Sequence, residues 1–117
     1  MTEADFRNAL DEYKDVIASI EILEISEEEN ISNLRSRLRV YDGTILWVRE
    51  IRNKESIVSY SYYWLRSDET VIIGWDNAPH HNEVSSFPNH KHIGNKIEAS
   101  QESNLRDVLN FIKKFLG

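Results

Sequence analysis

The chain has 117 residues, 40% of them hydrophobic, and a formal net charge of −6. This length supports one packed domain, and the absence of cysteine excludes a disulfide framework, a thiolate metal site and a cysteine nucleophile. No apolar run is long enough to span a bilayer, and the acidic start of the chain does not resemble a signal peptide. A cytoplasmic protein is therefore expected, and any binding to nucleic acid requires a segregated basic patch.

The first predicted element is an amphipathic helix that begins at Thr2 or Asp5, both good N-caps, and ends near Ser19. Apolar residues recur there at three- or four-residue spacing, which places them on one helix face. They are Phe6, Leu10, Tyr13, Ile17 and Ile20. The β-branched residues that follow, up to Ile25, favour a strand.

From Ile31 the apolar residues alternate with polar ones, which is typical of half-buried strands. The Asp42-Gly43 pair is the clearest hairpin signal, because both residues tolerate positive φ. Sequential strands joined by short turns predict an antiparallel meander. The predicted strands are Ile31–Tyr41, Thr44–Ile51, Ile57–Arg66 and Thr70–Trp75.

A final helix is predicted from Ser103, as its cap, to Leu116, with Lys113 and Lys114 complementing its C-terminal dipole. The expected fold is α+β: a four- to five-stranded antiparallel meander with N- and C-terminal helices on one face, in a single domain of residues 1–117. The open sheet edges permit either a monomer or a homodimer.

The segment from Asp76 to about Gly94 has no clear period and contains all four histidines of the chain. Long loops inside a compact domain are more often functional than idle. In an extended chain His90 and His92 point to the same side, whereas neighbouring residues point to opposite sides. A convergent site is therefore expected to use His90, His92 and only one of His80 and His81.

Three interpretations of these histidines are open. As general acid and base on RNA, one imidazole would deprotonate the 2′-hydroxyl and another would protonate the leaving 5′-oxygen, with Asp76 orienting a ring and no cofactor required. As metal ligands, His80 or His81 with His90, His92 and Asp76 would bind a divalent metal, although the spacing matches no standard zinc motif. In the third interpretation they only hydrogen-bond to the loop backbone.

Substrate binding has its own candidates. Arginines occupy alternate positions of the predicted strand Ile31–Tyr41 and form a stripe along it. Polar loop residues flank the histidines. A solvated strand face, paired with Glu50 or a similar acid, is the simpler interpretation of the stripe. Unpaired bases would stack on exposed Tyr or Trp side chains, although the aromatic run 60–64 is predicted to be mostly core. The candidates are Arg35, Arg37 and Arg39 of the stripe, with Asn77 and Lys91.

The histidine segment resembles a known family. WDNAPHH at Trp75–His81 and FPNHKH at Phe87–His92 are similar to the "DNAPHH … FPHHKH" pattern of TumE-like toxins from prokaryotic toxin–antitoxin systems. The resemblance extends from about Ser32 through the C-terminal helix. Asn89 stands where the family usually has a histidine, at a position that points away from the side shared by His90 and His92.

The resemblance implies a small toxin that a cognate antitoxin protein neutralises. It also implies an activity directed at RNA, for which the histidines would be the natural residues. The alternative is a non-catalytic module that binds a metal or a partner protein through the same loop.

Overall fold

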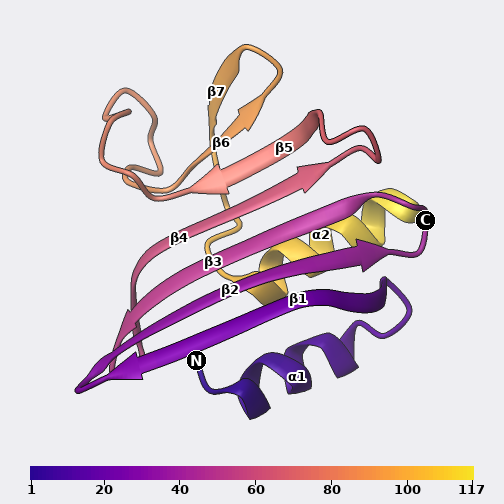
Figure 1. The fold of residues 1–117 in the computed structure, drawn as a ribbon. Coiled ribbons are helices and arrows are strands. Elements are labelled where there is room, and N and C mark those ends of the chain that lie inside the picture. The colour runs from indigo at the N-terminus through magenta and orange to yellow at the C-terminus, as the bar shows by residue number, and fades with distance from the viewer.

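The computed structural model describes residues 1–117 as a seven-stranded antiparallel sheet with two helices (Figure 1). Each strand pairs with the next one along the chain, so the sheet is the predicted meander. The elements, in order, are α1 (Glu3–Glu12), β1 (Ile17–Glu28), β2 (Ile31–Val40), β3 (Ile45–Asn53), β4 (Ser56–Leu65), β5 (Val71–Asp76), β6 (His90–Ile93), β7 (Lys96–Ala99) and α2 (Leu105–Leu116).

Helix α1 ends at Glu12, so the predicted end near Ser19 is wrong. Its start is as expected: the Thr2 hydroxyl accepts from the Asp5 amide at 3.1 Å, and the Asp5 carboxylate accepts from the Thr2 amide at 3.2 Å. The apolar spacing ran on past the helix because Ile17 also faces the core, but from strand β1. The β-branched residues of this segment favour strand pairing over another helical turn.

Helix α2 is capped by Asn104, whose side chain accepts from the Asp107 amide at 2.9 Å. The prediction that Ser103 is the cap is therefore wrong by one residue. Lys113 and Lys114 lie in the last turn as predicted, where their charges complement the helix dipole.

Both helices cover the same face of the sheet and share one hydrophobic core with it. Figure 1 shows α2 crossing β2 and β3 on the far side. An ion pair from Arg106 to Glu12 at 2.9 Å joins the two helices, and Lys113 of α2 pairs with Asp15, in the turn after α1, at 3.2 Å. No helix covers the opposite face of the sheet, which we call the open face. Fully buried core side chains include Phe6, Leu38, Val48, Tyr62, Trp64, Trp75, Leu109 and Ile112.

The sheet has two more strands than the largest predicted number, because β6, inside the predicted loop, forms a hairpin with β7, which follows that loop directly. Gly94 and Asn95 make the turn between them, and Gly94 adopts φ of 59°. Both strands are only four residues long, which is too short for a period of two to be recognised in the sequence. His90 and His92 therefore lie on a strand that pairs with β5, and not on a loop.

Candidate functional site

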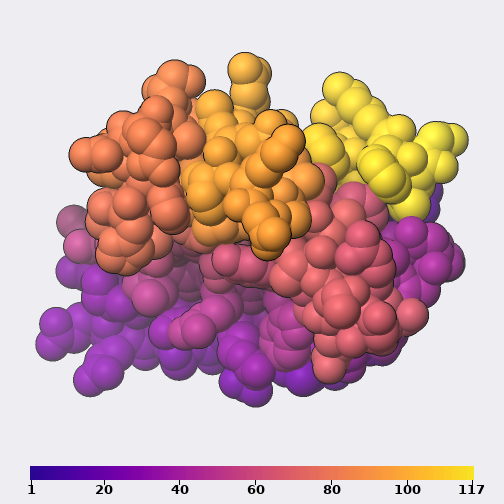
Figure 2. Space-filling model, turned by 90° about the horizontal axis from the view of Figure 1, so that it is seen from above, coloured from indigo at the N-terminus to yellow at the C-terminus, as the bar shows by residue number.

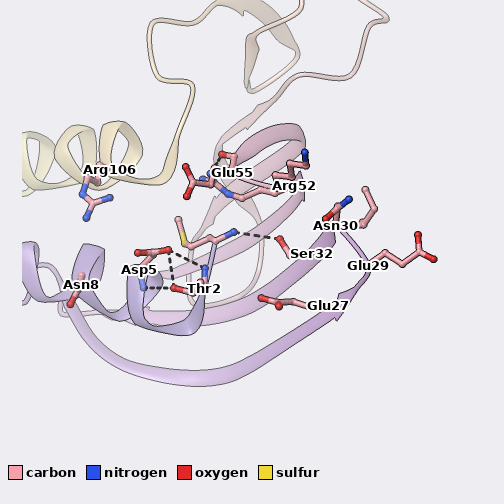
Figure 3. A pocket seen from close by; sticks show the side chains of 13 residues that line it. Thr2, Asp5, Asn8, Glu27, Glu29, Asn30, Ser32, Arg52, Glu55 and Arg106 are labelled. Carbon is pink, nitrogen blue, oxygen red and sulfur yellow. Dashed lines mark hydrogen bonds between the residues drawn. The ribbon is translucent and has the colours of Figure 1, made fainter.

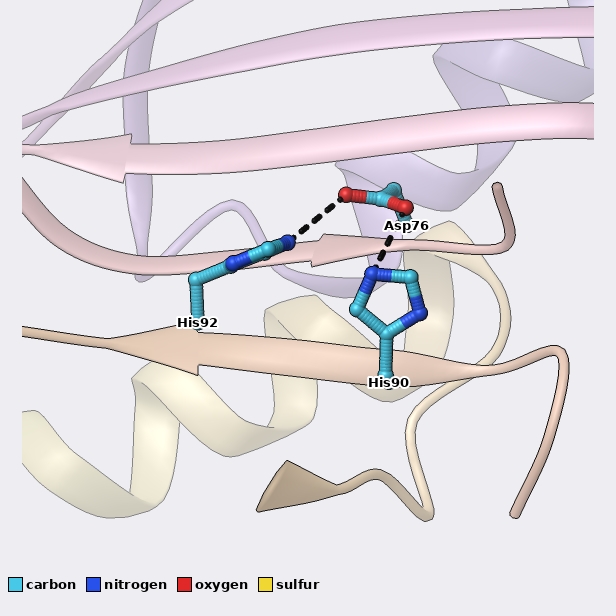
Figure 4. Close-up of side chains that lie close together, drawn as sticks. All are labelled: Asp76, His90 and His92. Carbon is cyan, nitrogen blue, oxygen red and sulfur yellow. Dashed lines mark hydrogen bonds and ion pairs between the residues drawn. The ribbon is translucent and has the colours of Figure 1, made fainter. Parts of the chain in front are cut away.

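Asp76 lies between His90 and His92 at the edge where β5 and β6 pair (Figure 4). The register places Asp76 opposite His90 and Gly74 opposite His92, so the three side chains project from one face. Asp76 Oδ1 lies 3.0 Å from His90 Nε2, and Asp76 Oδ2 lies 3.1 Å from His92 Nε2. One carboxylate therefore binds two imidazoles, as expected from the same-side placement of His90 and His92.

His90 is buried, with 1% of its side chain exposed, and both of its ring nitrogens face acceptors. Nδ1 lies 2.9 Å from the carbonyl oxygen of Pro88, which can only accept, so Nδ1 donates. Nε2 faces the Asp76 carboxylate. With Nδ1–H held by the backbone, Nε2 can share a proton with the Asp76 carboxylate or bind a metal ion.

His81 and His92 are the partly exposed imidazoles of the site, with 31% and 28% of their side chains exposed. Each has one nitrogen on a carboxylate: His92 Nε2 on Asp76, and His81 Nδ1 on Glu83 at 3.1 Å. A hydrogen bond from its own backbone amide, and then the His81 ring, lower the pKa of the Glu83 carboxyl, so this partner is anionic. The other nitrogen of each ring has no hydrogen-bond partner within the protein.

The ring centroids of His81 and His92 are 5.9 Å apart, and that of His81 lies 4.9 Å from the centroid of His90. The structure thus selects His81, and not His80, as the third imidazole. His80 is exposed in the loop, outside the cluster. We call Asp76, His81, His90 and His92 the histidine cluster.

Lys91 and Asn77, which were predicted as substrate-binding residues, do not face the histidine cluster. Lys91 lies over the Phe111 ring on the helix side and forms an ion pair with Glu102 at 3.5 Å. Asn77 accepts from the Tyr60 amide at 3.0 Å and donates to the carbonyl of Val58 at 3.2 Å. The Asn77 amide therefore bonds to the backbone of the first half of β4. Lys91 points away from its histidine neighbours, as strand alternation requires.

The stripe of Arg35, Arg37 and Arg39 projects from the open face of β2, but acidic side chains neutralise it. Arg35 pairs with Glu24, Arg37 and Arg39 share Glu21, and Arg37 also pairs with Glu69. The expectation that Glu50 would be a partner is wrong. The register places Glu50 opposite Leu34, on the covered face. There it is 1% exposed, pairs with Arg52 at 2.9 Å and accepts from the Tyr62 hydroxyl at 2.7 Å.

Tyr63, predicted only as part of a mostly buried aromatic run, is a neighbour of the histidine cluster. Its ring stacks against that of His92 with centroids 6.4 Å apart, and its hydroxyl lies 3.4 Å from Asp76 Oδ2. The ring lies over Gly74, where an added Cβ would clash with Tyr63 Cε1. A glycine inside a strand often marks such a close approach, which was the available signal.

Asn89, where the related sequences usually have histidine, accepts from the Tyr60 hydroxyl at 2.8 Å. Tyr60 lies on the covered face, so Asn89 points away from the cluster as expected. Burial, followed by the charge of Asp76, raises the pKa of Tyr60 to about 12, so its hydroxyl remains a donor at neutral pH.

A separate pocket of about 540 Å³ lies beside the start of α1 (Figure 3). Its lining mixes acidic and basic side chains and contains no histidine. Thr2 and Asp5 are engaged in the helix cap, and the Met1 amino group donates to Ser32 at 3.4 Å. Several lining residues thus hold the start of α1 in place, and none of them offers an imidazole for acid–base catalysis.

Comparison with known proteins places the chain among the toxins of toxin–antitoxin systems. A family model described as Toxin TumE matches residues 6–116, and the chain therefore belongs to the TumE toxin family. This confirms the resemblance found in the sequence and implies an antitoxin as partner. No curated protein and no solved structure matches the chain. Neither helix has the length and apolar character needed to cross a membrane.

Proposed function

We propose that this toxin cleaves RNA by general acid–base catalysis at the histidine cluster. The observation that supports the proposal is the arrangement of the neighbouring His81 and His92 rings. Each is held by a carboxylate through one nitrogen and presents the other nitrogen unbound, with ring centroids 5.9 Å apart. Two partly exposed imidazoles so arranged supply both proton transfers that cleavage of a phosphodiester requires. We propose a cytoplasmic location for this activity.

In the proposed reaction one imidazole takes the proton of a ribose 2′-hydroxyl. The 2′-oxygen then attacks the adjacent phosphorus, and the bond from phosphorus to the 5′-oxygen breaks. The second imidazole donates a proton to that oxygen as it leaves, so the products are a 2′,3′-cyclic phosphate and a 5′-hydroxyl. Asp76 and the buried His90 transfer no proton to or from the RNA in this scheme, and they position the His92 ring.

The test is cleavage of a mixed RNA pool by the wild type, His92→Ala and His80→Ala. Loss of one acid–base group should lower the rate by about 10² to 10⁴. His80→Ala is the matched control, since it removes an imidazole from the same loop but outside the cluster, and its rate should match the wild type. Equal rates for His92→Ala and wild type, with both proteins folded by thermal melting, would exclude the proposed role.

A second function, metal binding, is favoured by one observation. Asp76, His90 and His92 each offer a ligand atom, and these atoms lie within 4.8 Å of one another. His90 also donates Nδ1–H to a backbone carbonyl, which is the usual support of a metal-bound imidazole. His80 and His81 do not belong to this set, whereas the other expected ligands, Asp76, His90 and His92, do.

Metal binding predicts stoichiometric zinc, nickel or iron in untagged protein, and a melting temperature that falls in chelator because ligand binding stabilises the native state. Elemental analysis and thermal melts with and without EDTA measure both. Metal-free protein with an unchanged melt would eliminate this function.

A further inference from the structure

Arg49, on the open face of β3, is the only arginine of the chain with no ion pair or hydrogen bond from its side chain. The other seven all have acidic or carbonyl partners, including every arginine of the predicted stripe. Arg49 is also exposed. A free guanidinium is a strong site for phosphate, because it donates two parallel hydrogen bonds to phosphate oxygens.

Strand register places Arg49 in line with the histidine cluster. Arg49 pairs with Ser61, Ser61 with Asp76, and Asp76 with His90, so the four residues form one row across the open face. Neighbouring strands are about 4.8 Å apart, and Arg49 therefore lies roughly 10 Å from the β5 backbone at Asp76.

A groove of about 440 Å³ runs along the open face from Arg49 to Asp76. Its lining includes Arg49, Ser59, Ser61, Tyr63 and Asp76. In Figure 2 the orange residues of β6 and β7 stand above the purple and magenta strands, and the surface is hollowed between them. The groove therefore begins at a free cation and ends beside the histidine cluster, with an aromatic ring in its wall.

We propose that single-stranded RNA lies in this groove, with a backbone phosphate on Arg49 and an unpaired base against Tyr63. The proposal rests on the proposed ribonuclease function and names its substrate class. Aromatic rings on a sheet face stack bases that are splayed out of a strand, whereas an A-form duplex keeps its bases stacked on each other and presents mainly phosphates and 2′-hydroxyls. Arg49, and not the neutralised stripe on β2, supplies the positive charge.

The test is binding of a short fluorescein-labelled single-stranded RNA, measured by anisotropy across a range of salt concentrations. All proteins carry His92→Ala so that the RNA stays intact. Arg49→Gln should weaken binding about tenfold or more and reduce the slope of log K against log salt by about 0.7, the value for one phosphate contact on a single strand. Arg49→Lys should recover part of the affinity.

The matched control is Arg7→Gln, which removes the same charge from helix α1, where Arg7 pairs with Glu3 on the covered side. It should bind within twofold of the parent protein, and a duplex of the same sequence should bind more weakly than the single strand. Unchanged binding by Arg49→Gln, an equal loss in Arg7→Gln, or equal affinity for the duplex would overturn the proposal.

The failure of this inference is distinguishable from the failure of the ribonuclease function, because binding is measured without cleavage. Loss of binding in Arg49→Gln, in a protein whose wild type cleaves no RNA, would support the groove and exclude the nuclease. Cleavage by the wild type with no effect of Arg49→Gln on binding would exclude the groove and leave the nuclease in place.

Discussion

Asp76→Asn should lower the rate of RNA cleavage by about 10³ to 10⁴, with little change in the melting temperature. The Asp76 carboxylate accepts from His92 Nε2 and leaves Nδ1 as the free lone pair. An asparagine amide that turns its NH₂ group toward His92 would donate to Nε2 and thereby move the ring proton to Nδ1. The imidazole would keep its place but lose its free basic nitrogen.

Asp68→Asn is the matched control for Asp76→Asn. Asp68 lies in the turn between β4 and β5 and accepts from the Thr70 amide at 3.0 Å, far from any imidazole. The same chemical change there should leave the cleavage rate unchanged. A rate for Asp76→Asn within twofold of the wild type would show that the carboxylate does not set the state of His92. The measurement is single-turnover cleavage together with a thermal melt of each protein.

Trp75→Ala should cost about 3 to 5 kcal/mol of the free energy of unfolding. Trp75 is fully buried, meets Phe111 of α2 edge to face at 5.4 Å, and donates from Nε1 to Glu102 at 3.1 Å. Because it joins the sheet to α2 directly beside Asp76, its loss removes both core packing and the anchor of the site strand. With a typical urea m-value the unfolding midpoint should fall by about 2 M.

The comparison for this variant is Trp47→Ala. Trp47 lies half-buried on the open face of β3, where Arg35 covers its ring at 4.4 Å. Removing it leaves no closed cavity, so the midpoint should fall by much less. Urea unfolding followed by far-ultraviolet circular dichroism measures both variants. Equal midpoints for the two variants would contradict the assignment of Trp75 to the core.

The elements with a strong local signal were predictable from the sequence. Alternation, short turns and the Asp42-Gly43 pair gave four strands close to their observed bounds, and the same alternation placed His90 and His92 on one side. The two imidazoles converge on Asp76 because β6 pairs with β5 in a register that places Asp76 opposite His90. In these places local pattern and tertiary contacts agree.

Two features of the site depend on tertiary contacts that no local sequence pattern indicates. The choice of His81 over His80 is made by the fold of the loop and by Glu83. Arg49 is one of eight arginines, and only the pairing of all the others shows that it is free. The hairpin of β6 and β7 is different, because the Gly94-Asn95 pair between two short alternating runs is a local turn signal that went unpredicted.

The most direct test of the central claim is to identify the ends of RNA cut by the wild-type protein in EDTA. Acid–base catalysis by His81 and His92 predicts cleavage without metal that leaves a 2′,3′-cyclic phosphate and a 5′-hydroxyl. Mass spectrometry of the fragments reads both ends in one experiment. Cleavage that stops in EDTA, or that leaves a 5′-phosphate and a 3′-hydroxyl, would contradict the account.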